Sequence, residues 1–179
     1  MLRLIFCLLV WAIPMLSWGQ SIGIRQAEIR SEDEALVLDA DFELSFTHTL
    51  EEALQRGVPL YFTLELNVAR SRWLFDDSIS SQNQTWRIAY SPLTRDYRLS
   101  SGLYHTQVRN LDLVARQIAR VRGRKIIDKV LLKRNEKYLV SIRLLHDIGQ
   151  LPKPLQVSAL SNREWSLESE TLKLLLPTP

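Results

Sequence analysis

Residues 59–102 read PLYFTLELNVARSRWLFDDSISSQNQTWRIAYSPLTRDYRLSSG, and the alternation within them decides the fold. Every second side chain is apolar in the first part of this stretch, and the members of this set are Leu60, Phe62, Leu64, Leu66 and Val68. The same spacing returns at Trp73 and Phe75, at Trp86, Ile88 and Tyr90, and at Tyr97 and Leu99. A period of two is typical of strands that bury one face and leave the other in water. The stretch therefore predicts an antiparallel sheet with one dry, aromatic face.

A second alternating segment, residues 35–46, predicts a strand with an acidic outer face. Its even-numbered positions are all apolar, whereas Asp39, Asp41 and Glu43 lie on the other face. Buried charges without partners would be costly, so we expect the acidic face to be solvated. The three carboxylates could instead hold a cation, but no neighbouring loop supplies the additional oxygen ligands that calcium needs.

Shorter patterns predict the remaining strands. The first is expected at residues 20–30, with a bulge where the alternation changes phase between Ile24 and Ala27. Further strands are expected at residues 103–108, 126–133, 138–147, 155–159 and 165–176, the last of which could also be a short helix. The polar residues 134–137 are expected to form a hairpin loop, and residues 151–154 an extended spacer.

Two short helices are expected as connectors between strands. Thr49 and Glu52 form a capping box that predicts a helix ending at Gly57. Asn110 is expected to cap a second helix over residues 110–122, which carries one apolar stripe and ends at Gly123. The predicted fold is mostly β: an antiparallel, immunoglobulin-like β-sandwich of about seven to nine strands with two short connecting helices. The alternative is an α+β layer in which the second helix packs on one sheet.

The N-terminus has the organisation of a signal peptide. Arg3 precedes an apolar run, residues 4–16, that is shorter than the roughly 20 residues of a membrane-spanning helix. Small residues at positions 17 and 19 predict cleavage before Gln20. Residues 1–19 would then be a signal peptide, 20–176 a single β-rich domain and 177–179 a frayed tail. We expect a periplasmic protein with no transmembrane segment in its mature chain; an uncleaved anchor is the alternative, which Pro14 disfavours.

The charge distribution argues against nucleic acid as a partner. The chain carries 23 Lys and Arg against 20 Asp and Glu, a formal net charge of +3, and the two signs are interspersed. A nucleic-acid-binding protein gathers its basic residues on one patch or stripe. The only candidate stripe joins Arg116, Arg120, Arg122, Arg124 and Lys125. We interpret its arginines as charges near the end of a helix, where they offset the helix dipole; a polyanion or lipid head-group site is the alternative.

Residue types that would carry catalysis or bind a metal are few. The histidines, none at metal-ligand spacing, are His48, His105 and His146. The only cysteine, Cys7, lies in the expected signal peptide, and the sequence has neither a serine-nucleophile motif nor a glycine-rich phosphate loop. We therefore expect no enzyme, no metal and no cofactor. The alternative is an envelope hydrolase that acts through a histidine or through the acidic pair Asp76 and Asp77.

Four arginines of the central stretch are the candidate partner-binding residues, and they are Arg70, Arg72, Arg87 and Arg98. The alternation turns Arg87 and Arg98 outward where Trp86 and Tyr97 face the core, so we expect the four to form an outward row on adjacent strands. Such a row could bind a partner's carboxylates or a lipid phosphate. We favour the other interpretation, in which the arginines pair with neighbouring acids, such as Glu65 and Asp96, across the strands.

Three segments resemble a known family. They read PLYFTLELNVARSRWLFDD, TWRIAYSPLTRDYRLSSG and LPKPLQVSAL, with Trp165 after the last. Together they are similar to DUF4390, a family of exported proteins from Gram-negative bacteria that is described as a domain of unknown function. The resemblance covers residues 24–176 and implies export, a single domain and a role beside a membrane sensor kinase. It implies no catalytic residues.

These observations lead to one functional hypothesis with two alternatives. We expect an exported, non-catalytic binding or interaction module of the cell envelope, accessory to a membrane sensor and in contact with the periplasmic domain of a membrane protein. The alternatives are a binder of lipid or a small ligand, and an envelope hydrolase. The sequence leaves the oligomeric state and the identity of any ligand open.

Overall fold

The computed structural model describes residues 21–72 and 76–177, and in these ranges the chain forms nine strands and three α-helices. In chain order they are β1 (Gly23–Glu32), β2 (Ala35–Glu43), α2 (His48–Gln55), β3 (Leu60–Arg70), β4 (Asp77–Ser91), β5 (Asp96–Ser101), β6 (Tyr104–Val108), α3 (Leu111–Ala119), β7 (Arg120–Asp128), β8 (Tyr138–His146), α4 (Lys153–Ser161) and β9 (Leu172–Leu175). The predicted signal peptide and the alternation at Trp73 and Phe75 lie outside the described residues.

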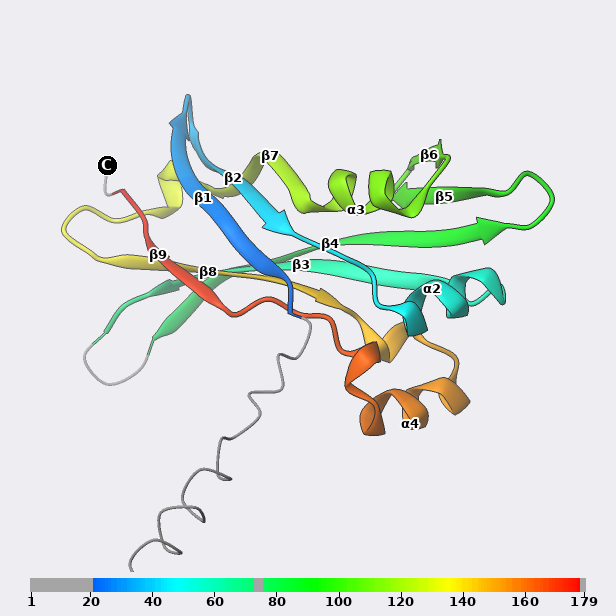
Figure 1. Ribbon diagram of the computed structural model, residues 1–179. Helices are drawn as coiled ribbons and strands as arrows, with labels where there is room; N and C mark the ends of the chain where they lie inside the picture. Colours follow the sequence, from blue (N-terminus) through cyan, green and yellow to red (C-terminus); the bar gives the residue numbers. More distant parts are fainter. Residues whose placement is uncertain (1–20, 73–75, 178–179) are drawn as a thin grey trace, which may run out of the picture.

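The strands form two antiparallel sheets. The larger has the order β6-β5-β4-β3-β8-β9, and the smaller has the order β1-β2-β7. Figure 1 shows the smaller sheet layered across the larger one, with α3 beside it over the β5 and β6 end. The mostly β, two-sheet fold predicted from the sequence is confirmed, and the helix α4 is an element that the sequence did not predict.

The core lies between the facing sides of the two sheets. Phe62 and Leu64 of β3 and Ile88 of β4 are fully buried, and Leu38 of β2 packs in the same cluster. These are the side chains that the two-residue period assigned to the dry face, so the alternation is confirmed. Thr63 is an exception on the predicted wet face: it is 5% exposed, since β3 is a central strand with neighbours on both sides.

The acidic face of β2 is covered by arginines rather than by water alone. Two of its carboxylates are held by neighbouring strands: Arg30 Nε of β1 donates to Asp39 Oδ2 at 2.6 Å, and Arg122 Nη2 of β7 donates to Asp41 Oδ1 at 2.6 Å. Glu43 accepts from Arg25 at 3.0 Å. Within the residues that the structure describes, no group of three acidic, histidine or cysteine side chains is arranged to hold a metal ion. The row is therefore an ion-paired sheet face.

The second predicted helix is shorter than expected, and this corrects the interpretation of its basic residues. The helix α3 ends at Ala119, and β7 begins at Arg120 without a loop. Gly123 does not end a helix; it lies in β7 with φ of +57°, and its N–H donates to Asp39 Oδ1 at 2.7 Å. A helix C-cap and one type of strand bulge both place a glycine in the left-handed conformation, so the glycine alone does not distinguish them. Arg120 and Arg122 consequently lie on a strand, and Arg116 alone occupies the last helical turn.

The segment after β7 also differs from the prediction. The strand expected at 126–133 ends at Asp128, and a 3-10 turn follows at Lys129–Leu131. Residues 134–137 do not close a hairpin, because β7 and β8 belong to different sheets and this polar segment crosses between them. The apolar residues expected to continue the strand belong to this turn, and the register between β2 and β7 itself shifts twice.

The predicted extended spacer and strand at 151–159 are wrong, since this region forms the helix α4. A 3-10 turn at Ile148–Gln150 precedes it, and Pro154 lies in its first turn, where a missing backbone N–H costs nothing. Gln156 Nε2 fixes the helix by donating to the carbonyl oxygen of Leu151 at 2.7 Å. Ala159 is the one fully buried residue of α4. The strand was predicted from only three alternating apolar residues, which are too few to distinguish a strand from a helix.

The capping box assigned to Thr49 is wrong by two residues, because the residue that caps α2 is Thr47. Its hydroxyl accepts from the N–H of Leu50 at 3.2 Å and donates to the carbonyl oxygen of Glu164 at 2.7 Å. Thr49 lies inside the first turn, where its hydroxyl donates to the Glu164 carboxylate. Glu164 belongs to a 3-10 turn at Arg163–Trp165, so α2 is tied to the C-terminal part of the chain.

Candidate functional site

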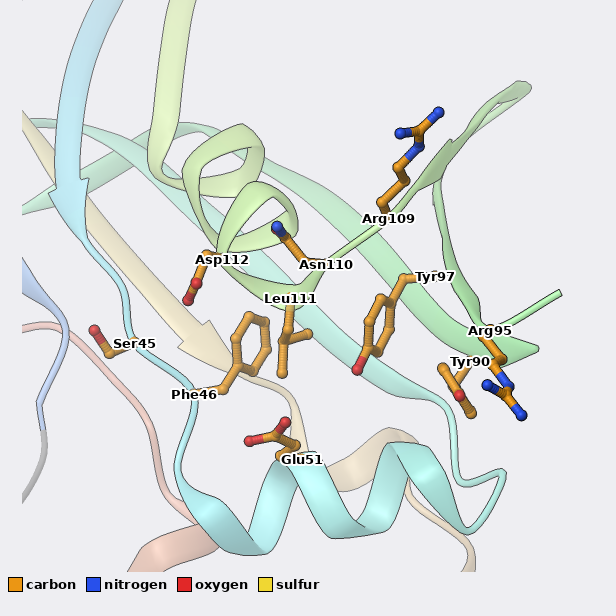
Figure 2. Close-up of a pocket in the computed structure, with 10 residues that line it drawn as sticks. All are labelled: Ser45, Phe46, Glu51, Tyr90, Arg95, Tyr97, Arg109, Asn110, Leu111 and Asp112. Atoms are coloured by element: carbon orange, nitrogen blue, oxygen red, sulfur yellow. The ribbon is translucent and has the colours of Figure 1, made fainter. Parts of the chain in front are cut away.

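A pocket of about 460 Å³ lies where α2, the start of α3 and the β4–β5 turn meet (Figure 2). We call it the α2–α3 pocket. Its lining combines aromatic, apolar and charged side chains, and these residues are Ser45, Phe46, Glu51, Tyr90, Arg95, Tyr97, Arg109, Asn110, Leu111 and Asp112. They come from four separate parts of the chain, so the pocket exists only in the folded protein.

Local structure holds each side of the pocket. Asn110 caps α3, with its Oδ1 accepting from the N–H of Leu113 at 2.9 Å, and this fixes the first turn that carries Leu111 and Asp112. Arg95 has φ of +55° in the β4–β5 turn, and its N–H donates to the carbonyl oxygen of Ser91 at 2.8 Å. The α2 side is fixed by the N-cap described above. Three defined turns or helix starts therefore support the lining residues.

Aromatic and apolar side chains form one wall of the pocket. The rings of Tyr90 and Tyr97 lie 5.1 Å apart and are tilted by 50°. In Figure 2, Leu111 lies between Phe46 and Tyr97, and the three project toward the same space. Rings with exposed faces can hold a cation through their quadrupoles, and they can also pack against apolar groups.

The hydroxyl of Tyr97 is directed into the pocket from a buried side chain. Tyr97 is 7% exposed, and Figure 2 shows its hydroxyl turned toward the pocket interior. Burial raises the pKa of Tyr97, and the negative charges of the nearby Glu51 carboxylate and of the Tyr90 phenol, when ionised, raise it further. Tyr97 is thus a protonated donor near neutral pH, and it makes no side-chain hydrogen bond within the described part of the chain.

The charged groups of the pocket are separated by sign. Glu51 and Asp112 lie toward the Phe46 side, whereas Arg95 and Arg109 lie on the side of the tyrosines (Figure 2). None of these four forms an ion pair with another residue in the ranges 21–72 and 76–177. The acids of β2 behave differently, because each is paired with an arginine.

Two other hollows in the described structure have different linings. One, of about 540 Å³, lies between β1 and β9, and its Arg25 is already paired with Glu43. The other, of about 580 Å³, lies beside the β5–β6 turn and has Arg124 as its one charged lining residue. The α2–α3 pocket is therefore the best candidate site, since it presents uncompensated charges of both signs.

In the comparison with protein families, the model of Domain of unknown function (DUF4390) matches residues 19–174. The chain belongs to this family. No curated protein and no solved structure matches the chain. The resemblance seen in the sequence is thereby confirmed, and membership in this family assigns no activity.

The structure separates the four candidate arginines into two groups. Arg87 and Arg98 lie on the outer face of the larger sheet, on adjacent strands, where Arg87 is paired in register with Tyr61 and Arg98 with Ala89. Arg70 lies at the opposite end of β3, beside the buried ring of Tyr138. Nine residues of strand between positions 61 and 70 span about 30 Å, so the four arginines do not form one row.

The two groups also differ in their partners. The side chain of Arg70 is 17% exposed, and its Nη1 donates to Glu136 Oε1 at 3.1 Å, which gives it a structural role. Arg72 is 4.0 Å from Asp77, at the limit of an ion pair. Arg87 donates to the hydroxyl of Tyr61 at 3.2 Å, and Arg98 forms no ion pair among the described residues.

The residues of the hydrolase alternative are not brought together. His48 pairs with Glu52 on α2, and His105 is exposed on the edge strand β6. His146 is 3% exposed at the end of β8, with Nδ1 2.7 Å from the carbonyl oxygen of Trp165. Asp77 begins β4 next to the arginines at the far end of the hairpin.

Among the described residues, no helix has the length and hydropathy needed to cross a membrane.

Proposed function

We propose that this protein is an exported, non-catalytic binding module of the cell envelope, and that it binds its ligand in the α2–α3 pocket. The main observation behind this proposal is that the pocket is lined by charged side chains that form no ion pair with any other described residue. Such groups lie around the rim, and a buried tyrosine hydroxyl is directed inward beside an apolar wall (Figure 2). That combination is typical of a ligand site.

The chemistry of the lining favours binding over catalysis. A general base must carry a suitable pKa within hydrogen-bond reach of its proton, and histidine most often fills this role. No histidine lines the α2–α3 pocket, and the raised pKa of Tyr97 makes that phenol a poor base at neutral pH. Arginine remains protonated and cannot act as a base under physiological conditions. Glu51 and Asp112 are carboxylates, which can also serve as bases, and we assign the lining the role of holding and orienting a ligand.

We propose export because of the N-terminal sequence. A positive start, a short apolar run and small residues at positions 17 and 19 are typical of a secretory signal. A ligand-binding module in the periplasm would act by contact, which suits an accessory of a membrane sensor. The ligand would then change how the module meets the periplasmic domain of that sensor.

A second candidate function is protein binding through the outer face of the larger sheet. It is favoured by Arg87 and Arg98, which are exposed on adjacent strands and form no ion pair among the described residues. The test is recovery of a specific envelope protein by the mature chain, with loss of that protein when both arginines are changed to glutamate. Equal recovery by the charge-reversed variant would remove this face as the partner surface.

The principal test is native mass spectrometry of the protein purified from the periplasm. We expect an added mass on the wild-type chain that disappears on denaturation. Glu51→Gln combined with Arg109→Gln should lose the adduct, whereas Arg116→Gln, an exposed position on α3 outside the pocket, should keep it. A wild-type protein that is always free of ligand would contradict the proposed function.

A further inference from the structure

We infer that the α2–α3 pocket binds a zwitterionic head group in which an ammonium ion ends the molecule and a phosphate ester joins it to the remainder. This inference rests on the proposed function and specifies the chemistry of its ligand. Phosphocholine and phosphoethanolamine groups have this order of charges. They occur both as soluble phosphate esters and as head groups of phospholipids.

The acidic end of the pocket matches the ammonium ion. The carboxylate of Glu51 extends from α2 toward the wall formed by Phe46 and Leu111 in Figure 2. It is close enough to Tyr97 to contribute to the raised pKa of that phenol. An ammonium ion placed here would gain the Glu51 carboxylate on one side and the ring of Phe46 on the other. Cation–π contacts of this kind are the usual means of recognising alkylated ammonium groups.

The basic end of the pocket matches the phosphate ester. Arg95 and Arg109 are exposed residues that come from opposite sides of Tyr97 in the view of Figure 2. Guanidinium groups bind phosphate oxygens through paired N–H donors; the two groups point apart in Figure 2, so an exposed arginine side chain would turn inward to meet a phosphate at the rim. The phosphate would lie toward the open rim, because the two arginines are more exposed than Tyr97 and Glu51.

The order of charges distinguishes this ligand from other zwitterions. A terminal ammonium ion can enter as far as Glu51 while the phosphate stays near the arginines and the remainder of the molecule leaves the pocket. An α-amino acid carries both charges on one carbon atom and could not reach both ends in this way. A polyanion would meet Glu51 and Asp112 without compensation and would be disfavoured.

Apolar residues beside the pocket indicate how the remainder of a lipid ligand could be accommodated. Leu93, in the same turn as Arg95, is 94% exposed, and Leu113, in the first turn of α3, is 40% exposed. An exposed leucine next to a phosphate-binding arginine is suited to the boundary between head groups and acyl chains. The lipid and the soluble ester share the pocket chemistry, and the experiment separates these two sources.

The experiment is isothermal titration of the mature protein with phosphocholine and with phosphoethanolamine. We expect at least one of them to bind roughly tenfold or more tightly than choline or glycerol phosphate, each of which supplies only one of the two charges. The analogue 3,3-dimethylbutyl phosphate keeps the shape and the phosphate of phosphocholine but has an uncharged tert-butyl group in place of the ammonium ion. It should also bind roughly tenfold more weakly than phosphocholine.

Matched variants assign the binding to the pocket. Glu51→Gln and Arg109→Gln should each weaken binding roughly tenfold, since each removes a charge-assisted contact. Glu28→Gln and Arg116→Gln alter exposed residues outside the pocket and should leave the affinity unchanged. Thermal unfolding of each variant establishes that it is folded. If one pocket variant does not fold, the other still tests the assignment.

Co-sedimentation with vesicles identifies the source of the head group. Vesicles of phosphatidylcholine, and of phosphatidylethanolamine with phosphatidylglycerol, are compared with vesicles of phosphatidylglycerol alone. Binding to the zwitterionic vesicles identifies a lipid ligand, and binding only to the free esters identifies a soluble one; both outcomes support the inference. It is overturned if neither esters nor zwitterionic vesicles bind, or if the pocket variants bind as the wild type does. An adduct that persists in native mass spectrometry would then show that the proposed function stands with a different ligand.

Discussion

His146 is a titratable side chain in the core that the proposed binding does not use. It is 3% exposed, its ring lies 5.3 Å from that of Phe62, and its Nε2 has no partner among the described residues. Burial lowers the pKa of His146 from the ordinary 6.5, although the Trp165 carbonyl and Asp147 oppose the shift. The folded state therefore favours the neutral ring.

This burial predicts how stability changes with pH. Above pH 6.5 the ring is neutral in both states, so its contribution is fully present. As the pH falls below 6.5, the unfolded chain takes up the proton first, and stability falls until the pH has passed the lowered pKa of the folded state. Urea unfolding of the mature chain at a series of pH values measures this loss. His146→Phe, which cannot titrate, should show a shallower decline; an equal slope would contradict the assignment.

Gly123 gives a second prediction at the scale of one residue. Its φ of +57° is left-handed, and a Cβ built there would meet nothing within 4 Å. The cost of Gly123→Ala is therefore one of backbone strain, and we expect a loss of about 1–2 kcal/mol in the free energy of unfolding. Gly123→Asn should cost less, because asparagine tolerates this conformation. Chemical denaturation tests both variants, and a neutral alanine substitution would rule out the bulge conformation.

At the scale of the element, the N-cap of α2 is one of the features that the sequence placed wrongly. Thr47→Ala removes the cap and leaves the carbonyl of Glu164 without its donor, so we expect a loss of about 1–2 kcal/mol. Thr49→Ala removes a hydroxyl at a more exposed position and should cost less. Thermal and urea unfolding of the two variants compare them directly. A larger loss for Thr49→Ala would show that the cap is at Thr49 after all.

The elements that the sequence predicted well are those with long, uninterrupted alternation. In β3 the period of two continues through four repeats and fixes both the strand and its buried face. Where the pattern was short, as in α4, or interrupted by bulges, as in β7, it was compatible with more than one element. What the sequence did not show is where α3 ends and β7 begins. In the structure the chain leaves the helix at this point because β7 pairs with the free edge of β2.

At the scale of the whole molecule, the sequence predicted the two-sheet fold but not the site. The α2–α3 pocket joins residues as distant in sequence as Ser45 and Asp112, and only the packing of α3 beside the β4–β5 turn brings them together. Arg95 and Glu51 resemble any other exposed or half-exposed charge when read along the chain. Two arginines that did stand out, Arg87 and Arg98, were conspicuous because of their neighbours Trp86 and Tyr97, which are buried in the core from β4 and β5.

Export is a prediction about the whole chain. If residues 1–19 are a signal peptide, expression of the full sequence should yield a periplasmic protein whose N-terminal residue is Gln20. Cell fractionation followed by N-terminal sequencing measures both properties. A protein that keeps Met1, or that stays in the cytoplasm, would contradict the proposed location.

The most direct test of the central claim, that the α2–α3 pocket is a binding site, is nuclear magnetic resonance of the ¹⁵N-labelled mature protein. Backbone amide shifts are recorded before and after addition of a periplasmic and envelope-lipid extract. The account predicts shift changes at Glu51, Arg95, Tyr97 and Leu111, while residues of the β1–β2 turn remain unaffected. Changes confined to another surface, or no changes with any extract, would contradict it.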